Sequence, residues 1–119
     1  MNKWLLWFFR LIAAGVLMPV GSMKLFGDDM SVLLFDLLGM EPHGRIIVGV
    51  IEVTAALLLL SPQSAIGALI AVGIMFGAII AHITVLGVQV GGDGGRLVMM
   101  LVLVFASSAV VFIAQRRDL

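Results

Sequence analysis

The sequence lacks two residue types that carry much of the redox chemistry of proteins. None of its 119 residues is cysteine and none is tyrosine. Disulfides, thiol–disulfide exchange and thiolate metal ligands are therefore excluded, and so is a tyrosyl acid or radical. Charge is also scarce, since charged residues make up 12% of the chain and the seven basic and seven acidic residues cancel. Without a basic stripe or a recognition motif, no nucleic-acid partner is predicted.

Apolar residues take the place of the missing charge. They make up 62% of the chain, whose mean hydropathy is +1.24, whereas soluble domains average about 45–50% apolar residues. A chain this short would expose much of that surface to water. The composition therefore predicts an integral membrane protein, all-α, with residues 1–119 forming a single transmembrane domain.

Four apolar segments predict the membrane-spanning helices. A span needs about 20 residues, and we expect helices over residues 4–23, 45–61, 64–86 and 96–114. The tight turn Ser61-Pro62-Gln63-Ser64 forces an antiparallel hairpin between the second and third of them. The prediction is a membrane-spanning antiparallel four-helix bundle.

The first loop, residues 24–44, is the longest connection. It contains an apolar run over residues 32–38 that is too short to span and is bounded by acidic residues. Such a run is typical of a short interfacial or re-entrant helix, which Gly39 and Pro42 would end. We predict that this loop caps the bundle.

The basic residues outside the helices predict the orientation. Lys3, Arg116 and Arg117 flank the first and last helices, and basic residues mark the cytoplasmic side. The expectation is a multi-pass protein of the inner (cytoplasmic) membrane with both termini in the cytoplasm.

Five ionisable residues fall inside or at the ends of the predicted helices: Arg10, Lys24, Glu52, His82 and Arg96. A charged group at membrane depth costs about 2.5–3.5 kcal/mol on insertion scales, so it normally faces the bundle interior. Each of the five lies at helical spacing from small or soft residues, which allow close packing. We expect four inward faces: Arg10-Ala14-Leu17-Gly21-Lys24, Arg45-Gly49-Glu52-Ala56, Gly67-Ala71-Met75-Ala78-His82 and Arg96-Met100-Leu103-Ser107.

Depth divides these residues into two groups. Lys24, Glu52, His82 and Arg96 belong to the outer half under the capping loop, with Glu52 roughly 10 Å below the outer end of its helix. Arg10 lies deeper, towards the cytoplasmic half. We take all five as candidate ligand-binding residues, because ionisable residues at such depth are functional candidates.

Structural roles stand beside the functional ones. Glu52 could form an ion pair with Lys24 or Arg10 or remain protonated, and His82 could cap a helix end. Lys24, Arg45 and Arg96 could reach the interface with their long side chains. No catalytic residue is assigned. No metal site is predicted either, because His82 and His43 lack a third ligand.

Several short motifs occur in an order that resembles the DoxX-like family of small bacterial four-helix membrane proteins. They are Arg10-Leu11, the segment GSMKLFG at residues 21–27, Pro42, Gly49-Val50-Ile51-Glu52, Pro62 and Met75-Phe76-Gly77-Ala78. The resemblance covers nearly the whole chain. It implies that the family's basic residue of the first helix is Lys24 or Arg10, and that its glutamate of the second helix is Glu52. It also implies a link to quinone-linked sulfur oxidation or to membrane-bound redox complexes, although the absence of cysteine argues against direct thiol chemistry.

Three functions are compatible with these observations. The first is a binding or accessory subunit that holds a small amphipathic molecule, a quinone or a lipid, near Glu52. The second is a quinone-linked oxidoreductase subunit in which Glu52 and His82 carry protons. The third is a small-ion transporter, which would need oligomers. No intrinsic cofactor is expected, and quinone is the candidate for a bound one. The expected partner is membrane lipid, and further copies of the chain or a redox complex are candidate partners.

Overall fold

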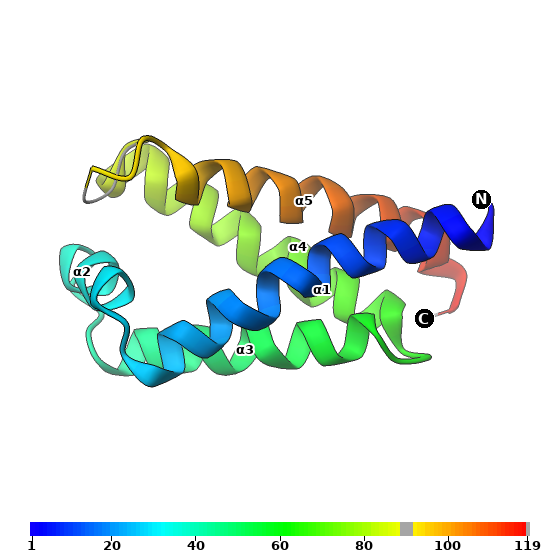
Figure 1. Ribbon diagram of the computed structural model, residues 1–119, viewed down its shortest axis with the longest axis horizontal. Coiled ribbons are helices and arrows are strands. Elements are labelled where there is room, and N and C mark those ends of the chain that lie inside the picture. The colour runs from blue at the N-terminus through cyan, green and yellow to red at the C-terminus, as the bar shows by residue number, and fades with distance from the viewer. Residues whose placement is uncertain (89–91, 119) are drawn as a thin grey trace.

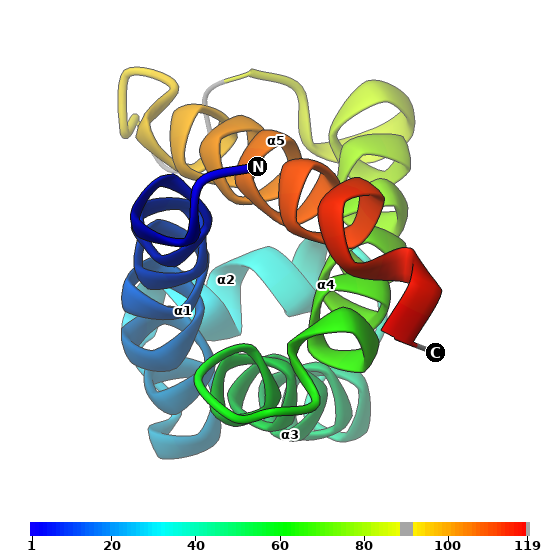
Figure 2. The same ribbon diagram turned by 90° about the vertical axis from the view of Figure 1, so that its right-hand side faces the viewer.

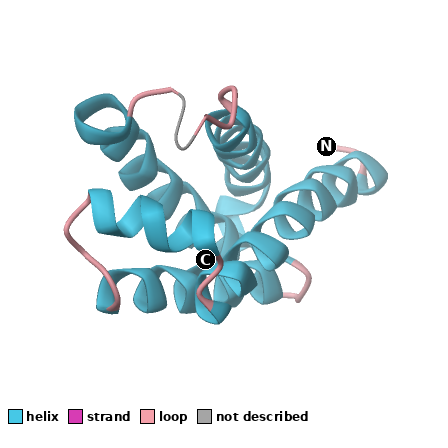
Figure 3. Cartoon of the chain, turned by 60° about the vertical axis from the view of Figure 1, so that its left-hand side comes forward, coloured by secondary structure: helices cyan, strands magenta, loops and turns pink. Residues whose placement is uncertain are grey.

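The computed structural model describes residues 1–88 and 92–118, and within these residues the chain is all-helical without a strand (Figures 1 and 3). Besides the α-helices, it has a π-helical segment (η1) and a short 3-10 helix (η2). The elements are α1 Lys3–Phe26, α2 Asp29–Leu37, α3 His43–Leu59, α4 Ser64–Ala81, η1 His82–Leu86, α5 Arg96–Gln115 and η2 Arg116–Asp118.

Local side-chain chemistry explains where these helices begin and end. The side chains of Asn2 and Asp28 accept hydrogen bonds from the first turns of α1 and α2, which satisfies amides that a helix start leaves unpaired. Gly27 ends α1 in a left-handed conformation, with φ of 78°, which glycine adopts without steric cost. The carboxylate of Asp93 accepts from the amides of Gly95 and Leu97 at the start of α5.

The predicted long helices lie where the structure has them to within a few residues, with one difference in the type of helix. The segment expected over residues 64–86 is α-helical only to Ala81 and continues as the π-helix η1. The predicted helix in the first loop is confirmed as α2, which Gly39 follows with φ of 70°.

The four long helices pack in a closed ring. α1 lies against α3 and α5, and α4 lies against the same two helices (Figure 2). α2 crosses one end of this ring and contacts α1, α3 and η1 (Figure 1). α2 therefore covers one end of the ring.

Two glycines allow α1 and α3 to approach closely. A Cβ atom built on Gly21 would lie 3.0 Å from Glu52 Cβ and 3.1 Å from the Gly49 carbonyl oxygen. A Cβ atom on Gly49 would in turn lie 3.0 Å from the Gly21 carbonyl oxygen. Small residues at such crossings bring backbones into van der Waals contact, which is the main attraction between helices in lipid.

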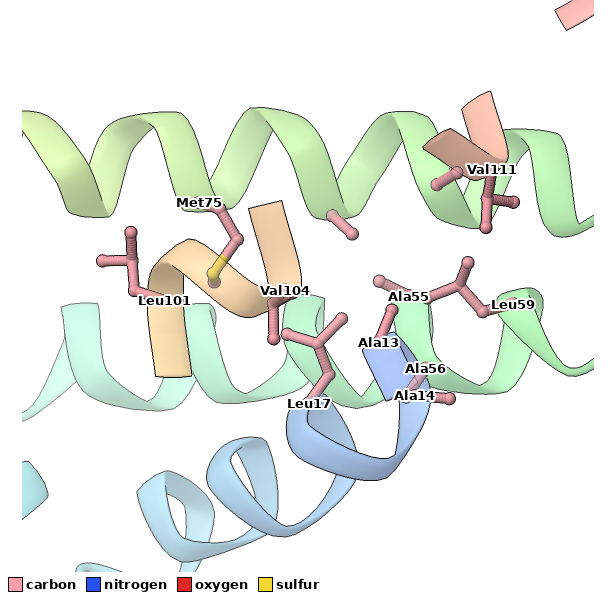
Figure 4. Close-up of a cluster of buried hydrophobic side chains, with 12 residues drawn as sticks. Ala13, Ala14, Leu17, Ala55, Ala56, Leu59, Met75, Leu101, Val104 and Val111 are labelled. Atoms are coloured by element: carbon pink, nitrogen blue, oxygen red, sulfur yellow. The ribbon is translucent and has the colours of Figure 1, made fainter. Parts of the chain in front are cut away.

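The hydrophobic core fills the middle of the ring and is built largely from alanine and other compact side chains (Figure 4). Every long helix contributes to it. Its buried members are Ala13, Ala14, Leu17, Ala55, Ala56, Leu59, Ala68, Ala71, Met75, Leu101, Val104 and Val111.

The inward faces predicted for α1 and α3 are confirmed. Arg10, Ala14, Leu17 and Gly21 are buried on α1, and Arg45, Gly49, Glu52 and Ala56 are buried on α3. On α4, Gly67, Ala71 and Met75 are buried as expected.

The face predicted for α5 is wrong at two of its four residues. Arg96 and Leu103 are exposed. Ser107 is buried as predicted, together with Leu101, Val104, Ser108 and Val111. Nearly every residue of α5 is apolar, so the hydrophobic pattern does not indicate which face of the helix is buried. The predicted face was based on Arg96. This is the first residue of the helix, where a side chain can point away from the core.

Three helical segments of the described chain are long and apolar enough to cross a membrane: Lys3–Phe26, Ser64–Leu86 and Arg96–Gln115. The second of them joins α4 and η1. α3 has 17 residues, and at 1.5 Å per residue it is a few ångströms shorter than the roughly 30 Å apolar layer of a bilayer. The protein therefore has the helices of a membrane protein.

Candidate functional site

A cavity of about 330 Å³ lies at the end of the ring that α2 covers. All four long helices contribute to its wall, α2 adds Leu34 and Phe35, and Leu38 follows directly after α2. Among the described residues, three ionisable side chains line it: Lys24, Glu52 and His82. The remaining wall is apolar, and its floor is formed by core residues that include Leu17, Met75 and Val104.

Glu52 and Lys24 form an ion pair on this wall. Glu52 Oε1 lies 2.8 Å from Lys24 Nζ, and the side chains are 2% and 12% exposed. Despite the short distance, no hydrogen bond of good geometry reaches Oε1 from the described residues. Because the contact with Lys24 is misaligned, the buried carboxylate of Glu52 does not accept all the hydrogen bonds that its lone pairs allow.

Helix packing fixes both partners of this pair. Lys24 lies in the last turn of α1, where a positive charge is favoured by the helix dipole. Glu52 follows Gly49 by one turn on α3, so the close contact at Gly21 and Gly49 carries the carboxylate towards α1. The ion pair therefore lies directly beside the glycine contact between α1 and α3.

His82 approaches the cavity from α4, at the first residue of η1. Its Nδ1 lies 2.8 Å from the Gly87 carbonyl oxygen. Because a carbonyl only accepts, Nδ1 carries the proton in this contact, and Nε2 of the neutral ring is an acceptor. Isolated π-helical turns are frequent at functional sites.

Arg10 lies outside the cavity and holds the opposite end of the helix pair. Its Nε donates to the Leu59 carbonyl at 2.7 Å and its Nη2 to the Ser61 carbonyl at 2.8 Å. The guanidinium also lies 3.7 Å from the centre of the Trp7 ring. Arg10 thus satisfies carbonyls that the end of α3 leaves without partners.

Arg45 does the same for the end of α1, a role that the sequence did not reveal. Its Nη1 donates to the Lys24 carbonyl, and its Nε lies 2.9 Å from the carboxylate of Glu41. Each helix of the pair therefore supplies a buried arginine to the last turn of the other. The available signal was the position of Arg45 on the inward face of α3.

Of the five predicted ligand-binding residues, the structure brings three together. Lys24, Glu52 and His82 line one cavity, whereas Arg10 binds the end of α3 and Arg96 is exposed at the start of α5. The described residues hold no group of three or more histidine, aspartate or glutamate side chains suited to a metal ion. The cavity therefore combines three side chains that can form hydrogen bonds with a wall that is otherwise apolar.

Comparison with known proteins gives one result. A model of the DoxX-like family matches residues 8–110, which include every residue that lines the cavity. Searches of curated proteins and of solved structures found no match. The chain belongs to the DoxX-like family.

Proposed function

We propose that this protein is a membrane-embedded binding or accessory subunit that holds the polar head of a small amphipathic molecule, a quinone or a lipid, beside Glu52. The observation that carries the proposal is the cavity, where an ion pair and a histidine stand at one place in an otherwise apolar wall. Ligand pockets typically combine about 300–1,000 Å³ of mostly apolar space with a few polar groups that orient the ligand.

In this proposal the ring of four helices is an antiparallel bundle that spans the inner membrane. The turn between α3 and α4 is short, and α2 with its neighbouring acidic residues covers the end opposite both termini (Figure 1). Lys3, Arg116 and Arg117 favour cytoplasmic termini, and the exposed Trp4 suits a membrane interface. The shorter α3 would cross with its polar first turn, including His43, in the outer interface.

The three polar side chains suit a head that carries carbonyl or hydroxyl groups. Lys24 Nζ can donate to a carbonyl oxygen, Glu52 can accept from a hydroxyl, and Nε2 of neutral His82 can accept as well. The apolar residues below them would hold the attached ring or the start of a chain. A hydroxyl group placed in this way would donate the hydrogen bond that Glu52 Oε1 lacks within the described part of the chain.

The proposal is tested by equilibrium binding to the protein in lipid nanodiscs. The probes are a labelled benzoquinone with a decyl chain and a labelled single-chain phospholipid. The first tests whether the ligand is a quinone, and the second tests whether it is a lipid. We expect one of them to bind saturably, and Glu52→Gln to weaken it about tenfold or more, because a hydrogen bond to a charged group contributes about 1.5–3 kcal/mol.

Asp36→Asn is the matched control. Asp36 is an exposed carboxylate on α2 and does not line the cavity, so this variant should bind like the unmodified protein. Absence of saturable binding for both probes would refute the proposal, as would equal affinity of the Glu52→Gln variant and the unmodified protein.

A quinone-linked oxidoreductase subunit is the second candidate, and one observation favours it. Glu52 and His82 line the same cavity, so a bound quinone would meet two groups able to carry the protons that accompany its reduction. Electrons would come from a substrate or a partner protein. Quinol formation by the membrane fraction, lost in Glu52→Gln and kept in Asp36→Asn, would distinguish this function from binding alone.

A further inference from the structure

Two glycines of α4 form part of the cavity wall. Gly73 and Gly77 line the cavity, and Ala81 continues the same row. Residues four apart lie above one another on a helix, so this stretch of wall is nearly bare backbone. The row faces the same space as Val48 and Glu52 of α3.

These glycines differ from those that serve helix packing. A Cβ atom on Gly67 would lie 2.7 Å from the Leu59 amide nitrogen, whereas one on Gly73 or Gly77 would meet nothing within 4 Å. Gly73 and Gly77 are also exposed. The two residues line the cavity and are exposed, as residues at the rim of an opening would be.

The course of α3 and α4 explains the opening. The two helices are in tight contact near their connecting turn, at Gly67, and α4 moves away from α3 towards the end that α2 covers (Figure 1). The glycine row lies along this diverging part. In a bilayer, an opening between two spanning helices faces the acyl chains.

We propose that the cavity opens sideways into the bilayer between α3 and α4, across Gly73 and Gly77, and that the chain of the bound molecule leaves through this opening. This inference rests on the proposed function. It assigns the ligand to long-chain amphiphiles, which place the head beside Lys24 and Glu52 and keep the rest of the chain in lipid. A cavity of about 330 Å³ is at the lower end of ligand pockets, so a long chain would extend beyond it.

A groove on the other side of α4 offers the competing route. It lies between η1 and α5 and is lined by residues that include Ile79, Ile83 and Val102. The side chains of His82 and Leu101 border both this groove and the cavity. They therefore stand between the two spaces, whereas no side chain projects from the glycine row.

The test compares two probes with the same benzoquinone ring, one with a decyl chain and one with a methyl group. In nanodiscs, Gly77→Leu should weaken binding of the decyl probe about tenfold or more, by placing a side chain in the opening. Because Gly77 also lines the cavity, binding of the methyl probe can weaken as well, but by a factor several times smaller. Gly15→Leu is the matched control. Gly15 is an exposed helical glycine whose Cβ would also meet nothing within 4 Å, and it does not line the cavity.

A photoreactive group at the end of the decyl chain gives a second measurement on the unmodified protein. Labelling of α3 within residues 47–51 is the expected result, and labelling of α5 at Val98 or Val102 would overturn the inference in favour of the groove. Equal loss of both probes in Gly77→Leu would also overturn it. If neither probe binds to the unmodified protein, the proposed function itself fails, whereas binding with α5 labelling leaves that function intact.

Discussion

Replacing Gly21 by valine should push α1 and α3 apart and should destabilise the protein. A Cβ atom alone would lie 3.0 Å from Glu52 Cβ and 3.1 Å from the Gly49 carbonyl oxygen, and a backbone atom cannot move aside as a side chain can. Overpacking of this kind costs about 1–3 kcal/mol, and more where backbones collide. The fraction folded during a titration with sodium dodecyl sulfate measures the effect.

Gly15→Val is the control, because Gly15 lies on the same helix and has open space around its Cβ position. It introduces the same β-branched side chain into α1. Its folded fraction should match that of the unmodified protein. Equal behaviour of the Gly21 and Gly15 variants would show that the close approach of α1 and α3 does not stabilise the fold.

Lys24→Met should destabilise the protein by about 3–5 kcal/mol, the range seen when one partner of a buried ion pair is removed. Glu52 is 2% exposed and its Oε1 lies 2.8 Å from Lys24 Nζ, so the variant leaves a buried carboxylate without its cation. The midpoint of the detergent titration should fall accordingly.

The double variant Lys24→Met/Glu52→Gln provides the internal check. It removes the charge that the single variant leaves unpaired, so part of the lost stability should return, and the double-mutant cycle should give a coupling energy of about 0.5–3 kcal/mol. Additive losses in the double variant would mean that the two side chains do not stabilise each other.

The sequence predicted the helices and the inward faces of α1 and α3 because these helices carry few polar residues at regular spacing. Arg10, Lys24, Arg45 and Glu52 follow a helical period, and burial of a charge in lipid forces such residues inward. The same reasoning failed for α5. Its only charge before the C-terminal end is Arg96, which is exposed.

Other features of the site depend on how the helices are positioned relative to one another, which the residue pattern of a single helix does not indicate. Gly73 and Gly77 are separated by four residues in an apolar helix, a spacing typical of helix packing, yet they border open space. The hydrogen bond from Arg10 to the end of α3 depends on the position of α1 along the axis of α3. The sequence suggested that Lys24, Glu52 and His82 lie at similar depth, but not that they share a cavity.

The most direct test of the central claim is a structure of the protein in lipid nanodiscs saturated with the decyl benzoquinone. We predict density for the quinone ring in the cavity, within hydrogen-bonding distance of Glu52 or Lys24 and covered by Phe35. Occupation of the same space by repacked side chains, with the quinone found only on the outer surface of the helices, would contradict the account.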